Sequence, residues 1–138
     1  MSYHGRKAAQ QIIDERFEGR SLEVYTVDGD KLVGLVDEIG RHEIGMIVEG
    51  KPVVVERRAI LYIVTGLSDI HGAGSGCERD YVLDESFVGY DVTVRLVNGN
   101  EISGRLLKVS REEIGIAQEN RAIIVPRRSI VFIRIERK

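Results

Sequence analysis

Residues that cross-link a chain or interrupt it are scarce in this sequence. Its 138 residues include one cysteine and two prolines. The single cysteine, Cys77, cannot form an internal disulfide, which is typical of a reducing compartment. Its thiol is either inert and exposed or a reactive group that bridges two chains. The few prolines, the lack of a low-complexity tract and an apolar content of 43% indicate a folded chain with a substantial core.

Long apolar runs and an overall excess of one charge are also missing. No run approaches the roughly 20 apolar residues of a membrane-spanning helix. The N-terminus is polar, so we expect no signal peptide, no membrane partner and a cytoplasmic protein. A net charge of −2 excludes a polycation that coats nucleic acid non-specifically. The charge is uneven, because residues 87–138 hold ten Lys and Arg against six Asp and Glu.

No combination of residues points to catalysis or to a bound metal. The three histidines, His4, His42 and His71, lack the spacing of metal ligands, and Cys77 has no second thiol beside it. No Ser-His-Asp or Cys-His arrangement occurs in both halves of the chain. We therefore expect a protein that is not an enzyme and that binds neither a metal nor a cofactor.

What the sequence does contain is a duplication. Shifted against itself by seventy residues, it aligns without a gap. The matching segments are 12–19 with 82–89, 27–30 with 97–100, 41–45 with 111–115, and 57–60 with 127–130. So many identities and conservative exchanges at one offset indicate an internal repeat. Each repeat is too small for a large core of its own, so we expect each to pack against a neighbour.

A glycine-rich tract separates the repeats. Its centre reads Gly-Ala-Gly-Ser-Gly over residues 72–76. It lacks the Lys-Ser/Thr that follows a phosphate-binding loop, so a flexible linker is favoured. We assign residues 1–65 to repeat one, 66–78 to the linker and 79–138 to repeat two.

Each repeat predicts a short helix followed by five strands. Ala8, Ile12, Ile13 and Phe17 have helical spacing, and repeat two has a shorter version of this pattern. Alternating residues and the turns Asp-Gly at 28–29 and Asn-Gly at 98–99 predict hairpins. In repeat one the strands are expected at 22–26, 31–39, 43–48, 52–56 and 60–64. Gly34 and Gly104 lie inside long strands, where glycine marks a sharp bend.

The predicted fold is therefore mainly β. It consists of two tandem small β-barrels, each an N-terminal helix plus a five-stranded bent antiparallel sheet.

Two short motifs resemble signatures of the Sm and Sm-like (LSm) family. The first signature is matched by Phe87, Gly89, Val92, Val94, Leu96, Asn98, Gly99 and Gly104, and in repeat one by Phe17, Gly19, Leu22, Val24, Asp28, Gly29 and Gly34. The second is similar to the Lys-His-Ala-Ile stretch of the Hfq branch and is matched by residues 57–60 and 127–130. The chain thus resembles a tandem Sm-like protein with two Sm-like repeats.

The resemblance implies a homo-oligomer. Sm-like subunits form rings of six or seven in which an edge strand of one subunit pairs with an edge strand of the next. Such a ring leaves no unpaired strand exposed. Three chains of two repeats would form a six-domain pseudo-hexameric ring. The sequence leaves open whether the two repeats pair with each other or with repeats of other chains.

The resemblance also implies that single-stranded RNA binds at a pore rim, with the protein acting as a chaperone or scaffold. In this family the basic pair before the last strand holds RNA, and a residue between the second and third strands stacks on a base. Arginine suits this role because its planar charged group contacts phosphates and stacks on bases. The candidate RNA-binding residues are Arg57, Arg58, Arg127, Arg128, His42, Arg41 and Arg111. Repeat two has the acidic Glu112 where repeat one has His42, so we expect unequal pockets.

Two alternatives remain beside RNA binding. The arginine pairs could instead form ion pairs with Glu43, Glu56 or Glu113 and support the assembly. The chain would then be a non-enzymatic protein-assembly module, with the PRC-barrel family as its nearest fold relative. The five-residue spacing from Gly29 to Gly34 favours the Sm-like interpretation.

Overall fold

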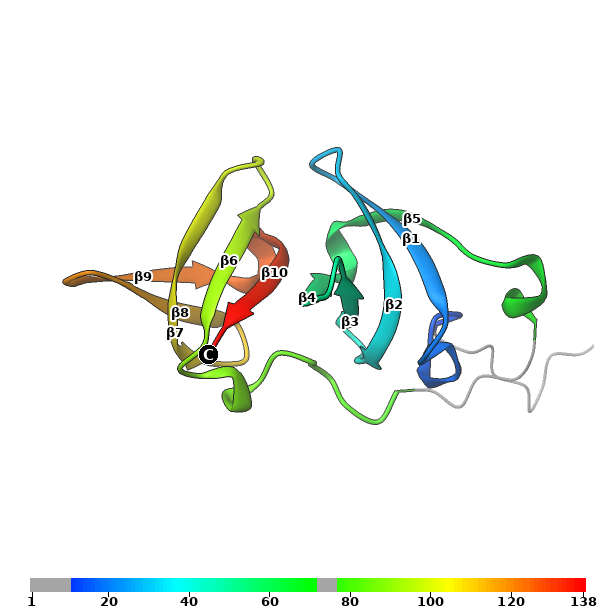
Figure 1. Cartoon of the computed structure of the whole chain (residues 1–138), viewed down its shortest axis with the longest axis horizontal. Helices are drawn as coiled ribbons and strands as arrows, with labels where there is room; N and C mark the ends of the chain where they lie inside the picture. Colours follow the sequence, from blue (N-terminus) through cyan, green and yellow to red (C-terminus); the bar gives the residue numbers. More distant parts are fainter. Residues whose placement is uncertain (1–10, 72–76) are drawn as a thin grey trace, which may run out of the picture.

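The computed structural model describes residues 11–71 and 77–138, and its regular structure is almost entirely antiparallel strand (Figure 1). The strands of repeat one are β1 (Ser21–Thr26), β2 (Lys31–Ile39), β3 (Glu43–Val48), β4 (Lys51–Glu56) and β5 (Ile60–Val64). Those of repeat two are β6 (Asp91–Leu96), β7 (Glu101–Val109), β8 (Glu113–Gln118), β9 (Arg121–Pro126) and β10 (Ile130–Arg137). The short 3-10 turns are η1 (Glu15–Phe17), η2 (Arg57–Ala59), η3 (Leu67–Ile70), η4 (Glu85–Phe87) and η5 (Arg127–Ser129). The mainly-β class is confirmed.

The two repeats have the same strand order and the same register at an offset of seventy. Ser21 pairs with Leu35 as Asp91 pairs with Arg105. The third and fourth strands match in the same way, residues 43–48 with 51–56 and residues 113–118 with 121–126. The gapless sequence alignment therefore corresponds to a structural repeat.

All ten strands belong to one open sheet, because the two repeats pair with each other. The strand order is β5-β1-β2-β3-β4-β10-β6-β7-β8-β9. The joint between the repeats is an antiparallel pairing of β4 with β10, in which Phe132 lies opposite Val55 and Arg134 opposite Val53. In Figure 1 these strands face each other at the centre of the molecule. The two repeats of one chain therefore pair with each other, which the sequence had left open. Strands β5 and β9 form the outer edges.

The helices predicted ahead of the strands do not form in the described residues, and this prediction is corrected. Only the single 3-10 turns η1 and η4 occur there, while Ala8, the start of the first predicted helix, lies outside the described residues. The backbone at Asp14 is extended, and its side chain caps η1. The carbonyl of Ile13 accepts a hydrogen bond from Arg57. These contacts use groups that a longer helix would need for its own hydrogen bonds.

The repeats share their hydrophobic interior across the joint. The core of repeat one includes Val131 and Phe132 of β10, and the core of repeat two includes Val54 of β4. All three side chains are almost completely buried. Burying a valine or phenylalanine stabilises the fold by about 1.5–3 kcal/mol each. The joint is therefore part of the folded core rather than a surface contact.

The helical segments of the described residues are all short. The Gly-Ala-Gly-Ser-Gly tract predicted to be flexible lies outside the described residues. The longest helical segment in the described part of the chain has four residues, and none is long and apolar enough to cross a membrane.

Gly34 and Gly104 allow the second strand of each repeat to lie directly on the third. A Cβ at Gly34 would overlap the backbone carbonyl oxygen of Ile47, and one at Gly104 would overlap that of Ala117. Two residues further on, each strand contains a register shift. The bend predicted from these glycines is thus a close backbone approach followed by an irregular pairing.

The atom that an added Cβ would overlap is a backbone carbonyl oxygen in both cases, and it cannot move aside as the end of a flexible side chain can. Gly34→Ala and Gly104→Ala should therefore each lower the free energy of unfolding by about 2 kcal/mol or more. Urea unfolding followed by circular dichroism would measure this decrease. Val33→Ala changes an exposed neighbour on the same strand and should cost less than about 1 kcal/mol. Equal stabilities for the glycine variants and Val33→Ala would contradict the close approach.

Candidate nucleic-acid interface

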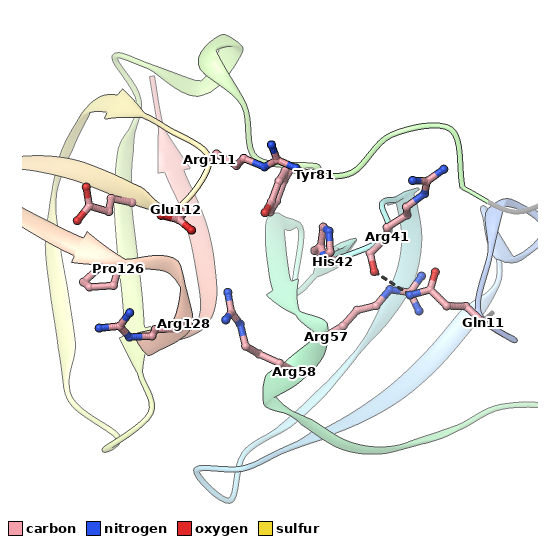
Figure 2. A pocket seen from close by; sticks show the side chains of 11 residues that line it. Gln11, Arg41, His42, Arg57, Arg58, Tyr81, Arg111, Glu112, Pro126 and Arg128 are labelled. Carbon is pink, nitrogen blue, oxygen red and sulfur yellow. Dashed lines mark hydrogen bonds between the residues drawn. The ribbon is translucent and has the colours of Figure 1, made fainter.

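A pocket of about 570 Å³ lies at the joint, beside the turns that carry the two arginine pairs (Figure 2). Its walls come from both repeats. The two loops that contribute, between β2 and β3 and between β7 and β8, are closed in the same way. Gly40 N–H donates to the carbonyl of Glu43, and Ser110 N–H donates to that of Glu113. The turns η2 and η5 provide the remaining arginines.

Six of the seven predicted RNA-binding residues line this pocket. They are Arg41, His42, Arg57, Arg58, Arg111 and Arg128. The lining also includes two acidic residues, Glu112 and Glu113. The pocket therefore gathers five guanidinium groups against two carboxylates, a positive excess that the net charge of the whole chain conceals.

Three of these arginines are exposed and keep their charges free. Arg58, Arg111 and Arg128 form no ion pair within residues 11–71 and 77–138. Arg41 lies 3.5 Å from the carboxylate of Asp80, and both side chains are largely exposed, so their attraction is weak. In Figure 2 Arg58 and Arg128 extend from the two turns on opposite sides of the joint. Their guanidinium groups are free to contact an anion.

The ring of His42 lies tilted against an aromatic side chain that the other repeat supplies. Its ring centroid lies 5.0 Å from that of Tyr81, with an angle of 31° between the rings. Tyr81 in turn covers the guanidinium group of Arg127, whose Cζ lies 4.3 Å from the ring centroid. The His42 side chain remains exposed and can contact a base. Repeat two has Glu112 at the equivalent position.

Arg127 is buried, which corrects the expectation that it contacts RNA. Its side chain is 3% exposed, and its Nη1 donates to Glu43 Oε2 at 2.7 Å. Its Nε and Nη2 donate to the carbonyls of Ser110 and Leu83. Because it is buried with these partners, the guanidinium group is not accessible to a phosphate from solvent. Arg127 is therefore a structural residue of the joint, as the alternative interpretation of the arginine pairs expected.

Arg57 occupies the equivalent place in repeat one and is half-buried. Its Nε and Nη2 donate to the carbonyls of Gly40 and Ile13, at 3.1 and 2.6 Å. The Sγ atom of Cys77 lies 3.9 Å from Nη2. Cys77 is half-buried against the core of repeat one, and burial raises the pKa of its thiol. Neither the exposed nor the reactive thiol considered from the sequence matches this environment.

Two buried carboxyl groups face Arg127 from strands β3 and β4. Glu43 Oε1 accepts the backbone N–H groups of Val82 and Leu83, at 2.7 and 2.8 Å. Glu56 lies opposite Glu43 in the strand pairing, and its oxygens accept no hydrogen bond from the described part of the chain. Burial raises the pKa of both groups, and with the neighbouring charge of Glu43 it raises the pKa of Glu56 to about 8. Glu43 has the partners of a carboxylate, so we assign the proton to Glu56.

The sequence predicted the arginines of this site but not the groups that hold the joint together. Glu43 and Glu56 were predicted only as possible ion-pair partners of the arginine pairs. Tyr81, which no motif singles out, lies at the joint. The repeat itself could have given a signal, because Glu56 and Tyr81 align with Pro126 and Gln11 and thus break the symmetry of the duplication.

Comparison with known proteins assigns no family. No protein-family model matches the chain. A search of curated proteins found no significant match. Within the described ranges no cluster of three or more His, Cys, Asp or Glu side chains could hold a metal ion.

The pKa of Glu56 predicts how stability depends on pH. Because the folded-state pKa of about 8 lies above the ordinary value of 4.5, the folded chain keeps a proton that the unfolded chain loses between these values. Stability should therefore fall as the pH rises from about 5 to about 8, by up to about 1.4 kcal/mol per unit, and level off above that. Glu56→Gln should remove this slope and raise the melting temperature at pH 8.

Thermal unfolding at pH 5, 6.5 and 8 would measure the effect. Glu18→Gln, at an exposed position, is the matched control and should follow the wild-type curve. Parallel curves for wild type and Glu56→Gln would show that Glu56 is ionised in the folded state and that the assignment of the proton is wrong.

Proposed function

We propose that this chain is a tandem Sm-like protein that binds single-stranded RNA at the joint between its repeats, as a non-enzymatic chaperone or scaffold. The observation that carries the proposal is the pocket in which Arg41, Arg57, Arg58, Arg111 and Arg128 meet from both repeats. Exposed guanidinium groups next to a histidine ring supply the two interactions that sequence-tolerant binding of single strands uses, namely phosphate contact and stacking.

The strand pairing at the joint supports the Sm-like interpretation. The sequence resemblance implies that an edge strand of one unit pairs with an edge strand of the next, and β4 pairs with β10 in this manner. Both outer edges, β5 and β9, have no further strand paired to them within residues 11–71 and 77–138. We propose that the same pairing continues between chains and that three chains close into a six-domain ring, since closure covers every edge.

In such a ring the two kinds of pocket would differ. The joint within a chain places His42 beside Tyr81. The equivalent positions at a joint between chains hold Glu112 and Gln11. An aromatic pair favours base stacking, whereas a carboxylate repels phosphate. We therefore propose that RNA binds more strongly at every second pocket.

The commitment of Arg127 to Glu43 favours a second candidate function, a protein-assembly module without RNA binding. In that case the exposed arginines would serve only solubility. Titration of fluorescent U-rich and A-rich oligomers at several salt concentrations separates the two functions, because only the first predicts saturable binding that weakens with salt.

Replacing both exposed arginines of the pairs should weaken RNA binding without unfolding the chain. Arg58→Ala with Arg128→Ala is expected to reduce affinity about tenfold or more, since each removes a charged hydrogen bond to RNA. The slope of log K against log salt should flatten by roughly 0.7 for each phosphate that the variant no longer binds. Stability should change by less than about 1 kcal/mol, because both side chains are exposed.

The matched control is Arg105→Ala with Arg137→Ala, which removes the same charge from exposed positions outside the pocket. Control and test variants with equal RNA affinity would refute binding at this pocket.

The unequal pockets give a separate prediction. His42→Ala should weaken RNA binding, because it removes the exposed ring beside Tyr81 that could stack on a base. Glu112→Ala should leave binding unchanged or improve it, because it removes a negative charge from the pocket lining. Fluorescence anisotropy with one oligomer and one salt concentration compares the two directly. A larger decrease in affinity for Glu112→Ala than for His42→Ala would contradict the proposed roles.

A further inference from the structure

The joint between β4 and β10 includes three contacts that each have one half in either repeat. The first is the strand pairing, in which Ile133 lies opposite Val54. The second is the buried ion pair of Glu43 with Arg127, which the backbone N–H groups of residues 82 and 83 complete. The third is a packing contact, because a Cβ at Gly45 would lie 3.0 Å from Val82 Cγ1. Each half has an equivalent seventy residues away.

The residues equivalent to the repeat-two half of each contact lie at the β5 edge of the chain. Within the described residues no repeat-one half faces them. Arg57 repeats the two carbonyl contacts of Arg127, but no hydrogen bond from its Nη1 occurs in the described residues. Ile12, the counterpart of Val82, is 55% exposed, whereas Val82 is 3% exposed. Tyr62 of β5 is 55% exposed, whereas its counterpart Phe132 is 2% exposed. The β5 edge therefore presents residues equivalent to those that repeat two presents at the joint, but no strand in the described residues faces them.

The residues equivalent to the repeat-one half of each contact lie at the β9 edge. Glu113, the counterpart of Glu43, is exposed and forms no ion pair within the described ranges. Ile124 of β9 is 67% exposed, whereas its counterpart Val54 is 3% exposed. A Cβ at Gly115, the counterpart of Gly45, would meet only Lys108 Cβ, at 3.8 Å. The surface that Val82 covers at Gly45 is therefore left open at Gly115.

We infer that Glu113 of one copy binds Arg57 of the next and thereby fixes the register of the chain-to-chain joint. In this clasp the carboxylate of Glu113 accepts the Arg57 guanidinium and the backbone N–H groups of residues 12 and 13, and Ile12 packs over Gly115. Strand β5 then pairs with β9, with Tyr62 opposite Val125 and Val64 opposite Ile123. The inference rests on the proposed closed assembly and is independent of RNA binding.

The charges at the two joints distinguish this clasp from the one within the chain. Within the chain Arg127 faces two carboxyl groups, Glu43 and Glu56. Between chains Arg57 would face one carboxylate of the next copy, Glu113, because Pro126 replaces Glu56. In its own chain Asp14, which is paired with Arg16, and the thiol of Cys77 also lie near Arg57. A single carboxylate paired with a single guanidinium needs no bound proton to be neutral. The joint between chains should therefore persist above pH 8, where Glu56 ionises within the chain.

The clasp is tested by Glu113→Ala, with Glu18→Ala as the matched control at an exposed acidic position away from both edges of the sheet. Light scattering and analytical ultracentrifugation without RNA measure assembly over a range of chain concentrations. Glu113→Ala should raise the dissociation constant between chains at least about 30-fold, the effect typical of removing one partner from a buried, hydrogen-bonded ion pair. Glu18→Ala should assemble like wild type. Because no RNA is present, failure to bind RNA does not affect this test.

Gly115→Val tests the same joint through packing. The added side chain fits the open surface of a single chain but would collide with Ile12 of the next copy. The variant should keep the wild-type circular dichroism spectrum and remain a single chain at concentrations where wild type assembles. Wild-type assembly by both Glu113→Ala and Gly115→Val would overturn the inference, as would a wild-type protein that stays a single chain at every concentration.

Discussion

The pairing of β4 with β10, held by the buried ion pair of Glu43 and Arg127, is the interaction on which the rest of this structure depends. It joins two five-stranded repeats into one sheet and brings Phe132 and Val54 into the opposite cores. Removing one partner of a buried ion pair leaves an uncompensated charge, which typically costs about 3–5 kcal/mol. The same interaction positions the basic pocket, because the turns and loops that carry its arginines lie on either side of the joint.

Duplication followed by divergence explains why the joint within the chain differs from the one proposed between chains. Within the chain the interaction uses Tyr81, His42 and a protonated Glu56 around Arg127. The equivalent positions hold Gln11, Glu112 and Pro126, so the exchanged residues are those that surround the arginine. The arginine and its carboxylate partner are themselves present in both repeats. The common pair fixes how repeats join, and the divergent neighbours determine the chemistry of each pocket.

Much of this arrangement could be predicted from the sequence, because it follows from local patterns. Alternating apolar residues and the Asp-Gly and Asn-Gly turns predicted the strands closely. Gly34 and Gly104 were predicted to mark a bend, and they lie where the second strand closely approaches the third. The candidate residues predicted from the sequence include the five arginines and the histidine of the pocket lining.

What the sequence could not show depends on contacts between distant residues. The spacing of Ile12, Ile13 and Phe17 predicted a helix, but the extended backbone at Asp14 and the hydrogen bond from Arg57 prevent one there. Arg127 and Arg128 are adjacent and chemically identical, yet one is buried and the other exposed, because only Arg127 points at Glu43. Such a distinction requires the three-dimensional position of a residue 84 positions away.

Hydrogen exchange at the two outer strands tests most directly whether the joint recurs between chains. In a single chain the outward-facing amides of β5 and β9 have no strand partner in the part of the chain that the structure describes, and they should exchange rapidly. The account predicts that these amides become protected as the chain concentration rises, while β1, β2, β6 and β7 are protected throughout. Rapid exchange at both edges at every concentration would contradict it.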